Sequence, residues 1–395
     1  MLKARQNHPT LHDHLSPKNK PKRILALDGG GVRGLMTLQM LKHIHGILAP
    51  RHRHMKDFHL CDYFDLIAGT STGAIIAACL AIRKPIEEIT RLYEEIIHTI
   101  FRSRWYTLGG ALIPKFSNKP LENALKLTLG EDIKLGGPEI RTGLLLMTKR
   151  FDTTSPWPIT NNPKGTFYEH VTGQKWIANS HFPLWKVVRA STAAPSFFKS
   201  EKIEVDRIEK EDETLIESGI FLDGGVSPHN NPALMAFLVA TLDGFKLQWK
   251  ASSESLFLVS LGTGRANPER KPSKWSGKQA VEALISLMDD CSVLNEIILQ
   301  GISQSTTARE IDSEMGDLKN DLICGKPVLS YVRYDVEFNS DWMHKNLDMR
   351  LDEKKLKKVE KMDRTDTKKE LVGIGVQASR KLIHASHFPK QFDLK

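Results

Sequence analysis

Apolar residues are arranged along the chain in two patterns, short continuous runs and runs with helical spacing. The runs 23–28 (RILALD) and 64–69 (FDLIAG) lead into glycine-containing turns. The first is followed by apolar residues at helical spacing and the second by a run of small and apolar residues. Each unit predicts a strand, a tight turn and a helix. Two such units favour an α/β fold in which helices cover a parallel sheet.

The same patterns continue toward the C-terminus. Further strands are predicted at 141–151, 218–225, 255–264 and 326–338, and helices at 86–101, 120–129, 184–193, 231–242 and 278–301. The proline- and asparagine-rich segment 155–165 predicts a loop, and the charged segment 201–214 predicts a surface hairpin. Several strands end in glycine or aspartate. In open α/β sheets, sites lie outside the carboxyl ends of the strands, so the chemistry is expected there.

Composition indicates a folded protein with two basic ends. The 395 residues are 40% hydrophobic, enough to bury a large core, and the net charge is +9. The excess positive charge lies in residues 1–23 and 342–395, so the middle is close to neutral. Such ends suit an anionic surface, either lipid headgroups or nucleic acid, although solvated termini are the plainer interpretation. Residues 1–23 are rich in proline, asparagine, histidine and lysine, which predicts disorder.

The cysteines and the apolar runs indicate a cytoplasmic protein. The 4 cysteines are widely spaced, without a CxxC pair for zinc or a dense disulfide framework. The longest apolar run, 74–82, is too short to span a bilayer, and residues 1–23 lack the apolar core of a signal peptide. We therefore expect a protein of the reducing cytoplasm.

The first motif is Gly69-Thr70-Ser71-Thr72-Gly73, which has the G-x-S-x-G pattern of a nucleophile elbow. The pattern alone is common. Its place between an apolar strand and a small-residue helix strengthens it, because the flanking glycines let the backbone turn sharply and expose the serine hydroxyl. The amino end of the helix then directs free N–H groups toward a developing oxyanion. Ser71 is therefore a candidate nucleophile.

The second motif is DGGGVRG (28–34), which allows two interpretations. Gly29, Gly31 and Gly34 fit the G-x-G-x-x-G fingerprint of dinucleotide-binding sites. That fingerprint requires a second strand that ends in an acidic residue about 20 residues later. The segment 49–64 is instead basic and rich in histidine, which weakens the nucleotide interpretation.

An oxyanion hole fits the glycine motif better. The consecutive N–H groups of Gly29, Gly30 and Gly31 can form a concave nest for negative charge, in which one donor stabilises a transition state by roughly 2.7–4 kcal/mol. Arg33 either adds positive charge there or ties loops together, and we favour the structural role.

The third motif is FLDGGVSPHNNP (221–232), an apolar strand that ends in Asp223. A DG pair usually marks only a turn. Because this strand is predicted in the same sheet, Asp223 can meet Ser71 across neighbouring loops. A triad would add a histidine after the acid, although no residue so far demands one. The histidines available for that role are His229, His344, His384 and His387.

These motifs resemble those of the patatin-like phospholipases, a family of lipid acyl hydrolases. DGGGVRG, GTSTG and DGG stand in the family's order, and RASTAAPSFF (189–198) and SLGTG (260–264) also look like its recurring segments. The resemblance implies a three-layer α/β/α fold with a mainly parallel central sheet and a catalytic domain over residues 24–264. Residues 1–23 would precede this domain as a basic, disordered segment. Residues 265–395 would follow it as a mainly helical extension packed on it.

The resemblance also implies a Ser–Asp dyad, with Ser71 as the nucleophile and Asp223 as its base. An aspartate with an ordinary pKa near 3.9 is a poor base for a serine hydroxyl, so Asp223 needs partial desolvation and a hydrogen bond to Ser71. The other site residues implied are the oxyanion loop, Gly29, Gly30, Gly31 and Arg33, and the elbow residues Gly69, Thr72 and Gly73.

The implied function is that of a phospholipase A-type lipid acyl hydrolase, which cleaves fatty-acyl esters through an acyl-enzyme and needs no metal or other cofactor. The expected partners are membrane phospholipids or other acyl lipids at an anionic surface, met from the cytoplasm by an enzyme that is peripheral to the membrane. No stable nucleic acid is expected. The acyl chain needs an apolar channel, for which Phe197–Phe198 and a lid at 101–116 are candidates, with core packing as the alternative.

Three alternatives stay open. Some bacterial members of the family look like effectors of anti-phage signalling that a cyclic nucleotide switches on, and the C-terminal third leaves room for control by an activating nucleotide. A dinucleotide-binding enzyme would hold its nucleotide irrespective of Ser71. A catalytically silent membrane or nucleic-acid adaptor would bind through the basic ends in a salt-sensitive way.

Overall fold

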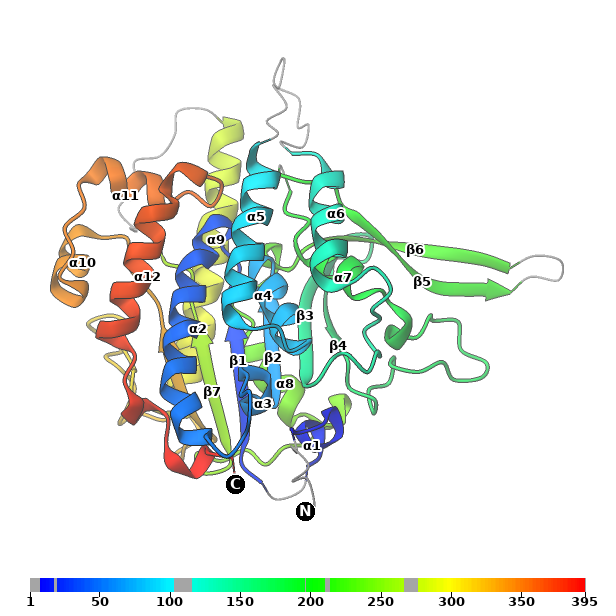
Figure 1. Cartoon of the computed structure of the whole chain (residues 1–395), viewed down its shortest axis with the longest axis horizontal. Helices are drawn as coiled ribbons and strands as arrows, with labels where there is room; N and C mark the ends of the chain where they lie inside the picture. Colours follow the sequence, from blue (N-terminus) through cyan, green and yellow to red (C-terminus); the bar gives the residue numbers. More distant parts are fainter. Residues whose placement is uncertain are drawn as a thin grey trace.

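A single sheet runs through the middle of the molecule in the computed structural model (Figure 1). The structure describes residues 8–17, 20–102, 116–195, 197–209, 214–265 and 276–394. Within these residues the sheet has nine strands in the order β5-β6-β3-β2-β1-β7-β9-β8, with β4 paired to β3. The strands are β1 (Lys22–Leu27), β2 (Leu66–Thr70), β3 (Gly143–Arg150), β4 (Ser155–Thr160), β5 (Glu201–Glu209), β6 (Thr214–Asp223), β7 (Leu256–Leu261), β8 (Ser303–Ser305) and β9 (Leu329–Tyr334).

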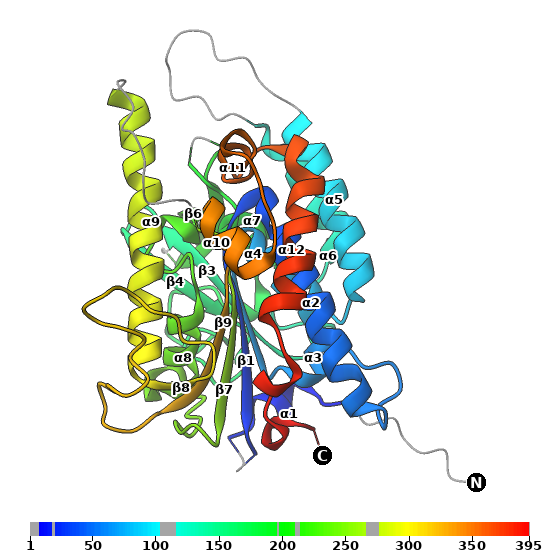
Figure 2. The ribbon, with the colours of Figure 1, turned by 90° about the vertical axis from the view of Figure 1, so that its left-hand side faces the viewer.

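Helices cover both faces of this sheet, as Figure 2 shows. One face carries α2 (Gly34–Leu48), α4 (Thr72–Ala81), α5 (Ile86–Arg102), α6 (Asn118–Leu129), α7 (Leu184–Ser191) and α12 (Lys368–Leu382), and the other carries α8 (Ala233–Thr241) and α9 (Ser276–Gly301). The shorter helices are α1 (Leu11–Leu15), α3 (Leu60–Tyr63), α10 (Ser340–Leu347) and α11 (Glu353–Val359).

The central strand β1 shows why the sheet needs both layers. Every residue of β1 is buried, and successive side chains alternate between two apolar cores. Leu25 and Leu27 belong to the core under α2, whereas Ile24 and Ala26 belong to the core under α8. β1 pairs in parallel with both β2 and β7, as expected of a strand covered on two faces. The predicted α/β/α architecture with a mainly parallel sheet is confirmed.

One local prediction was wrong. The segment 155–165, expected to be a loop, begins with β4, which pairs antiparallel with β3. Pro156 and Pro158 lie in this strand opposite Lys149 and Met147. Proline cannot donate to a ladder, but an edge strand tolerates it because one side of the strand needs no partner. The predicted hairpin is present as β5 and β6 and projects from the body (Figure 1).

The C-terminal third belongs to the same sheet as the motifs. β9 pairs in parallel with β7, and β8 in turn pairs with β9. α12 lies along α2, as both ribbon views show. The expected division at residue 264 is therefore not a structural boundary, because the hydrogen-bonded ladder continues across it. The linker candidate 264–277 lies largely outside the described residues.

The N-terminal segment differs from the expected disorder where it is described. Residues 11–15 form α1, and His14 is buried with its Nδ1 3.0 Å from Asp65 Oδ1. Lys22 and Arg23 are buried at the start of β1, and the Arg23 guanidinium donates two hydrogen bonds to Asp65, of 2.8 and 3.0 Å. These two cations are therefore used inside the protein and are not available to an anionic surface.

Candidate active site

Ser71 lies at a sharp turn between β2 and α4. Its backbone has φ 53° and ψ −122°, a left-handed conformation that is uncommon for a residue with a Cβ. The two flanking glycines are needed for close approach. A Cβ on Gly69 would overlap the Gly73 carbonyl, and a Cβ on Gly73 would overlap the Leu27 carbonyl. Glycine at both positions therefore lets α4 start directly against the ends of β1 and β2.

Strand register explains how Asp223 reaches this turn. Thr70, the last residue of β2, pairs with Met147 of β3, and Asp223, the last residue of β6, pairs with the next residue, Thr148. β4 occupies the opposite side of β3 at both positions. β2 and β6 therefore end against each other on one side of β3. The Ser71 hydroxyl thereby comes close to the Asp223 carboxylate and acts to lower its pKa.

The surroundings of Asp223 make it a stronger base than an ordinary aspartate. Asp223 is buried, and this burial raises the pKa of its carboxyl to about 6. Three groups oppose the rise: the Ser71 hydroxyl, the Gly225 N–H at 2.7 Å from Oδ1, and the positive charge of Arg189. The carboxylate is thus ionised near neutral pH and lies close to the hydroxyl that it would deprotonate.

The glycine loop lies directly against Ser71. A Cβ on Gly29 would be 3.0 Å from the Cβ of Ser71. Gly29 N–H donates to the Asn230 carbonyl at 3.2 Å, and Gly30 N–H donates to the Thr72 hydroxyl at 3.1 Å. To donate to an oxyanion, the Gly30 N–H has to give up its hydrogen bond to the Thr72 hydroxyl and form one to the substrate oxygen. Thr72, predicted only as part of the elbow, therefore also contacts the glycine loop.

Arg33 ties the glycine loop to its surroundings. Its Nε lies 3.4 Å from the Gly30 carbonyl and its guanidinium 3.5 Å from the Glu360 carbonyl, and it stacks over the Phe338 ring at 5.9 Å. These contacts favour the structural role over a direct charge on the oxyanion. Gly31 has φ 58°, which favours glycine, and its carbonyl accepts a hydrogen bond from the Tyr93 hydroxyl at 2.6 Å.

The structure adds two site residues that the sequence did not single out. Ser191 Oγ accepts the Ser71 N–H at 3.0 Å and donates to the Met147 carbonyl at 2.6 Å, which fixes the elbow to β3. Asn230 Oδ1 lies beside the Cα atoms of both Gly29 and Gly225. The available signals were weak: Ser191 lies within RASTAAPSFF, and Asn230 follows the DGG motif by five residues.

The candidate histidines do not complete a triad in this structure. The His229 carbonyl accepts from the Thr70 hydroxyl at 2.7 Å, and burial lowers the pKa of its ring. The other three contact residues of the C-terminal third. His344 lies 3.2 Å from Arg350, His387 lies 3.0 Å from the Tyr334 hydroxyl, and His384 packs against His387.

The candidate channel aromatics are packed together. Phe116 stacks with Phe197 at 6.2 Å and lies 5.8 Å from Phe198, and the Arg189 guanidinium lies over Phe198 at 5.3 Å. These contacts are the ones expected if the rings pack in the core, which was the alternative to lining an acyl channel. Residues 103–115 of the candidate lid lie outside the described residues.

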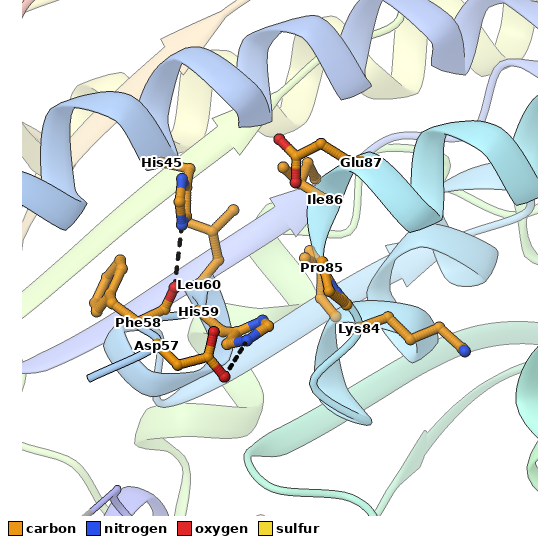
Figure 3. Close-up of a pocket in the computed structure, with 10 residues that line it drawn as sticks. His45, Asp57, Phe58, His59, Leu60, Lys84, Pro85, Ile86 and Glu87 are labelled. Carbon is orange, nitrogen blue, oxygen red and sulfur yellow. Dashed lines mark hydrogen bonds and ion pairs between the residues drawn. The ribbon is translucent and has the colours of Figure 1, made fainter. Parts of the chain in front are cut away.

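A cavity of about 140 Å³ lies away from Ser71, near the carboxyl end of α4 (Figure 3). In it the His45 ring is directed at the Phe58 carbonyl, and His59 is directed at Asp57. Neither Ser71 nor Asp223 lines this cavity, which is therefore separate from the elbow. The described part of the chain contains no helix with the length and hydropathy to cross a bilayer. Within that same part, no group of three or more His, Cys, Asp or Glu side chains is arranged to hold a metal ion.

Comparison with known proteins matches the same region. A family model described as patatin-like phospholipase matches residues 25–237. The cGAMP-activated phospholipase of Escherichia coli (strain TW11681) is 26% identical over 269 residues, 67% of this chain and 68% of the relative. The cUMP-AMP-activated phospholipase of Escherichia coli is 27% identical over 278 residues, 67% of this chain and 73% of the relative. Patatin-17 of Solanum cardiophyllum is 29% identical over 257 residues, 61% of this chain and 60% of the relative.

The matched region contains the glycine loop, the elbow and Asp223, and it spans more than half of the 395 residues. The fold has the mostly parallel, helix-flanked sheet expected of the family. The resemblance and the hydrolase class inferred from the motifs are therefore confirmed, and the chain belongs to the patatin-like phospholipases, a family of carboxylic ester hydrolases.

Proposed function

We propose that this protein is a phospholipase A-type lipid acyl hydrolase in which Ser71 is the nucleophile and Asp223 the general base. The observation that carries the proposal is that the Ser71 hydroxyl lies close to the buried Asp223 carboxylate, whose pKa is raised to about 6. A base with a pKa near the working pH is present in its ionised form and still accepts a proton effectively. The membership of the family supports the same assignment.

In the acylation step, Ser71 Oγ attacks the ester carbonyl carbon of a lipid while its proton moves to Asp223. The negative charge on the carbonyl oxygen is stabilised by N–H groups of the glycine loop and of the first turn of α4. The tetrahedral intermediate then collapses, the bond to the alcohol oxygen breaks, and Asp223 returns its proton to the departing lysolipid. An acyl-Ser71 ester remains.

In the deacylation step, Asp223 takes a proton from a water molecule that attacks the acyl-Ser71 carbonyl. The same N–H groups hold the second oxyanion. Collapse of this intermediate releases the fatty acid and gives the proton back to Ser71 Oγ. The cycle is balanced with water as the only co-substrate.

The proposed substrate surface is an anionic membrane, met from the cytoplasm. α11 buries Leu356 and exposes Lys354, Lys355 and Lys357, and the segment after α11 contacts the glycine loop. The lysines thus lie on a part of the fold that is joined to the site. Each well-placed Lys contributes about 1 kcal/mol near an anionic surface.

A variant pair tests this surface. Changing Lys354 and Lys355 to Glu is expected to weaken sedimentation with phosphatidylglycerol vesicles and to make the residual binding less salt-sensitive. The matched control changes Lys164 and Lys175, two exposed lysines in the segment between β4 and β5, to Glu. Equal effects of the two pairs would reject α11 as the docking element.

The activity itself is tested by fatty-acid release from mixed phospholipid vesicles in the presence of a chelator. We expect release by the wild type and none by Ser71→Ala or Asp223→Asn. Both variants should remain folded by circular dichroism, because each new side chain is no larger than the one it replaces. Release by Ser71→Ala at the wild-type rate would reject the serine mechanism.

A second candidate function is the same chemistry under control of a nucleotide. The observation that favours it is that two relatives described above are named as phospholipases activated by cGAMP or by cUMP-AMP. The vesicle assay is therefore repeated with each cyclic dinucleotide added. Release that depends on one of them would support a gated enzyme, and equal release without them would support a constitutive one.

A further inference from the structure

A buried ion pair lies at the base of the glycine loop. Asp28 follows β1 and precedes Gly29, and Arg333 lies on β9. The Arg333 guanidinium donates to Asp28 Oδ2 at 2.7 Å and to Asp28 Oδ1 at 3.4 Å. It also donates to Ser260 Oγ at 2.7 Å, on the strand between them. Asp28 and Arg333 are 4% and 8% exposed, so water contributes little to holding either charge.

Arg333 also supports the glycine loop by a second route. It donates to Asp335 Oδ2 at 2.7 Å, and Asp335 Oδ1 accepts the Gly264 N–H at 2.8 Å. The neighbouring Thr263 hydroxyl donates to the Gly29 carbonyl at 2.7 Å. A Cβ on Gly30 would overlap the Thr263 side chain, so this support lies directly under the loop.

The charges explain why a single arginine serves both sets of contacts, those to Asp28 and those to Asp335. The side chains of Asp28 and Asp335 are only 5% and 7% exposed. Burial raises the pKa of Asp28 to about 7 in spite of Arg333, whereas Arg333 and Arg265 outweigh burial at Asp335 and lower its pKa. Two carboxylates side by side in a low-dielectric interior also repel each other. Arg333 is hydrogen-bonded to both, so its removal would leave two buried carboxylates without this shared cation. A carboxylate left in that way becomes protonated or moves, and either response shifts the chain that leads into Gly29.

We propose that Arg333 is a positioning residue for the oxyanion loop, acting through Asp28 and through Asp335 with Thr263. The inference rests on the proposed hydrolase function. β9 lies outside residues 25–237, which the family model matches, so in this chain the geometry of the catalytic loop depends on a strand from the C-terminal third. Arg333 does not touch the substrate; it fixes the donors that do.

The chain contains a matched control at the other end of β1. Arg23 pairs with buried Asp65 through two hydrogen bonds, of 2.8 and 3.0 Å, and lies at the end of the strand away from the glycine loop. Arg23→Met and Arg333→Met each remove a buried arginine from an aspartate, so both are expected to lower stability. Only Arg333→Met is expected to disturb the oxyanion loop.

The experiment compares steady-state hydrolysis of a p-nitrophenyl ester by the wild type, Arg333→Met, Arg23→Met and Ser71→Ala, at a temperature at which all are folded by circular dichroism. We expect Arg333→Met to lower kcat by about 100-fold with little change in KM, the scale of losing one oxyanion donor. Arg23→Met should keep nearly the wild-type kcat. Arg333→Lys should recover part of the loss, because it keeps the charge but not the two-pronged geometry.

The outcomes separate this inference from the function on which it rests. Equal kcat values for Arg333→Met and Arg23→Met would overturn the positioning role, whereas an active Ser71→Ala would overturn the serine mechanism. If Arg333→Met does not fold, Asp28→Asn combined with Arg333→Met removes both members of the pair and leaves one carboxylate, Asp335, without Arg333 in place of two. That double variant is expected to keep a low kcat, and a wild-type kcat in it would also overturn the proposal.

Discussion

The Ser71 hydroxyl and the Asp223 carboxylate meet where two strands end against consecutive residues on one side of β3. Their proximity therefore follows from the register of the sheet, and the loops around it only complete the site. In the proposed mechanism, which uses no histidine, this one carboxylate takes the serine proton and returns it. The pKa of that carboxylate then controls both the activity and part of the stability.

The activity is expected to depend on pH through Asp223. Because burial raises the pKa of this carboxyl to about 6, the fraction able to act as a base falls about tenfold for each pH unit below 6. We expect kcat/KM for a soluble ester to rise up to about pH 6 and to level off above it. Initial rates between pH 4.5 and 8 measure this limb. A rise of kcat/KM centred near pH 4 would instead show that the base is a carboxylate with an ordinary pKa.

Asp223→Asn is expected to be more stable than the wild type above pH 6. An unfolded aspartate has a pKa near 3.9, whereas folded Asp223 has a pKa of about 6. Between these values the folded state retains a proton that the unfolded state has released, so the wild type loses stability as the pH rises through this window. Asparagine does not titrate. The free energy of unfolding of the variant should therefore rise by up to roughly 3 kcal/mol, relative to that of the wild type, between pH 4 and pH 8. Urea unfolding at both pH values measures the difference.

Asp65→Asn is a control for which we expect the opposite change in stability, because the pKa of Asp65 is lowered and that of Asp223 is raised. Burial acts to raise the pKa of Asp65, but Arg23, His14 and Lys22 together outweigh it and hold the pKa at about 2. This group therefore stabilises the fold above pH 4, and its contribution is lost as the pH falls toward 2. Asp65→Asn should be less stable than the wild type at pH 8. A gain in stability for both variants would contradict the assignment of the Asp223 pKa.

The turn at Ser71 is expected to store strain that can be measured. A residue with a Cβ at φ 53° and ψ −122° costs about 1–3 kcal/mol, because that region suits glycine. Ser71→Ala and Ser71→Gly both remove the hydroxyl, but only glycine also removes the Cβ. We expect Ser71→Gly to be about 1 kcal/mol more stable than Ser71→Ala, after the greater entropy of unfolded glycine is subtracted. Equal free energies of unfolding would show an unstrained turn.

The sequence predicted the local parts of the site well, because a few consecutive residues encode them. GTSTG specifies its own turn through the size of its glycines, and the apolar runs on either side specify the strand and helix. The contact between Arg333 and Asp28 has no such signal, because the two residues are 305 positions apart. An arginine in a short apolar strand gives no indication of which carboxylate it will meet.

Composition misled where tertiary contacts change the role of a residue. Lys22 and Arg23 look like part of a basic tail, but Asp65 holds both inside the fold. Pro156 and Pro158 look like loop residues, but the free side of an edge strand accepts them. In the first case the deciding partner, Asp65, lies 42 residues from Arg23, which a local pattern does not record.

Gly31→Ala is expected to reduce both activity and stability. Gly31 has φ 58°, which a Cβ disfavours, and the added Cβ would overlap the Met362 carbonyl. That carbonyl accepts the Val32 N–H at 2.8 Å, so moving it disturbs the loop on the side opposite Thr263. We expect a loss of at least 1 kcal/mol in the free energy of unfolding, together with a lower kcat.

Gly46→Ala is the matched control, because Gly46 lies on α2, the helix that follows the glycine loop. A Cβ at Gly46 meets no atom within 4 Å in the structure. Alanine inside a helix is favoured over glycine by roughly 0.5–1 kcal/mol, so this variant should gain stability and keep its kcat. Urea unfolding and initial rates on the two variants measure both effects. If Gly31→Ala behaved like Gly46→Ala, close contact between the glycine loop and the Met362 segment could not be a requirement for catalysis.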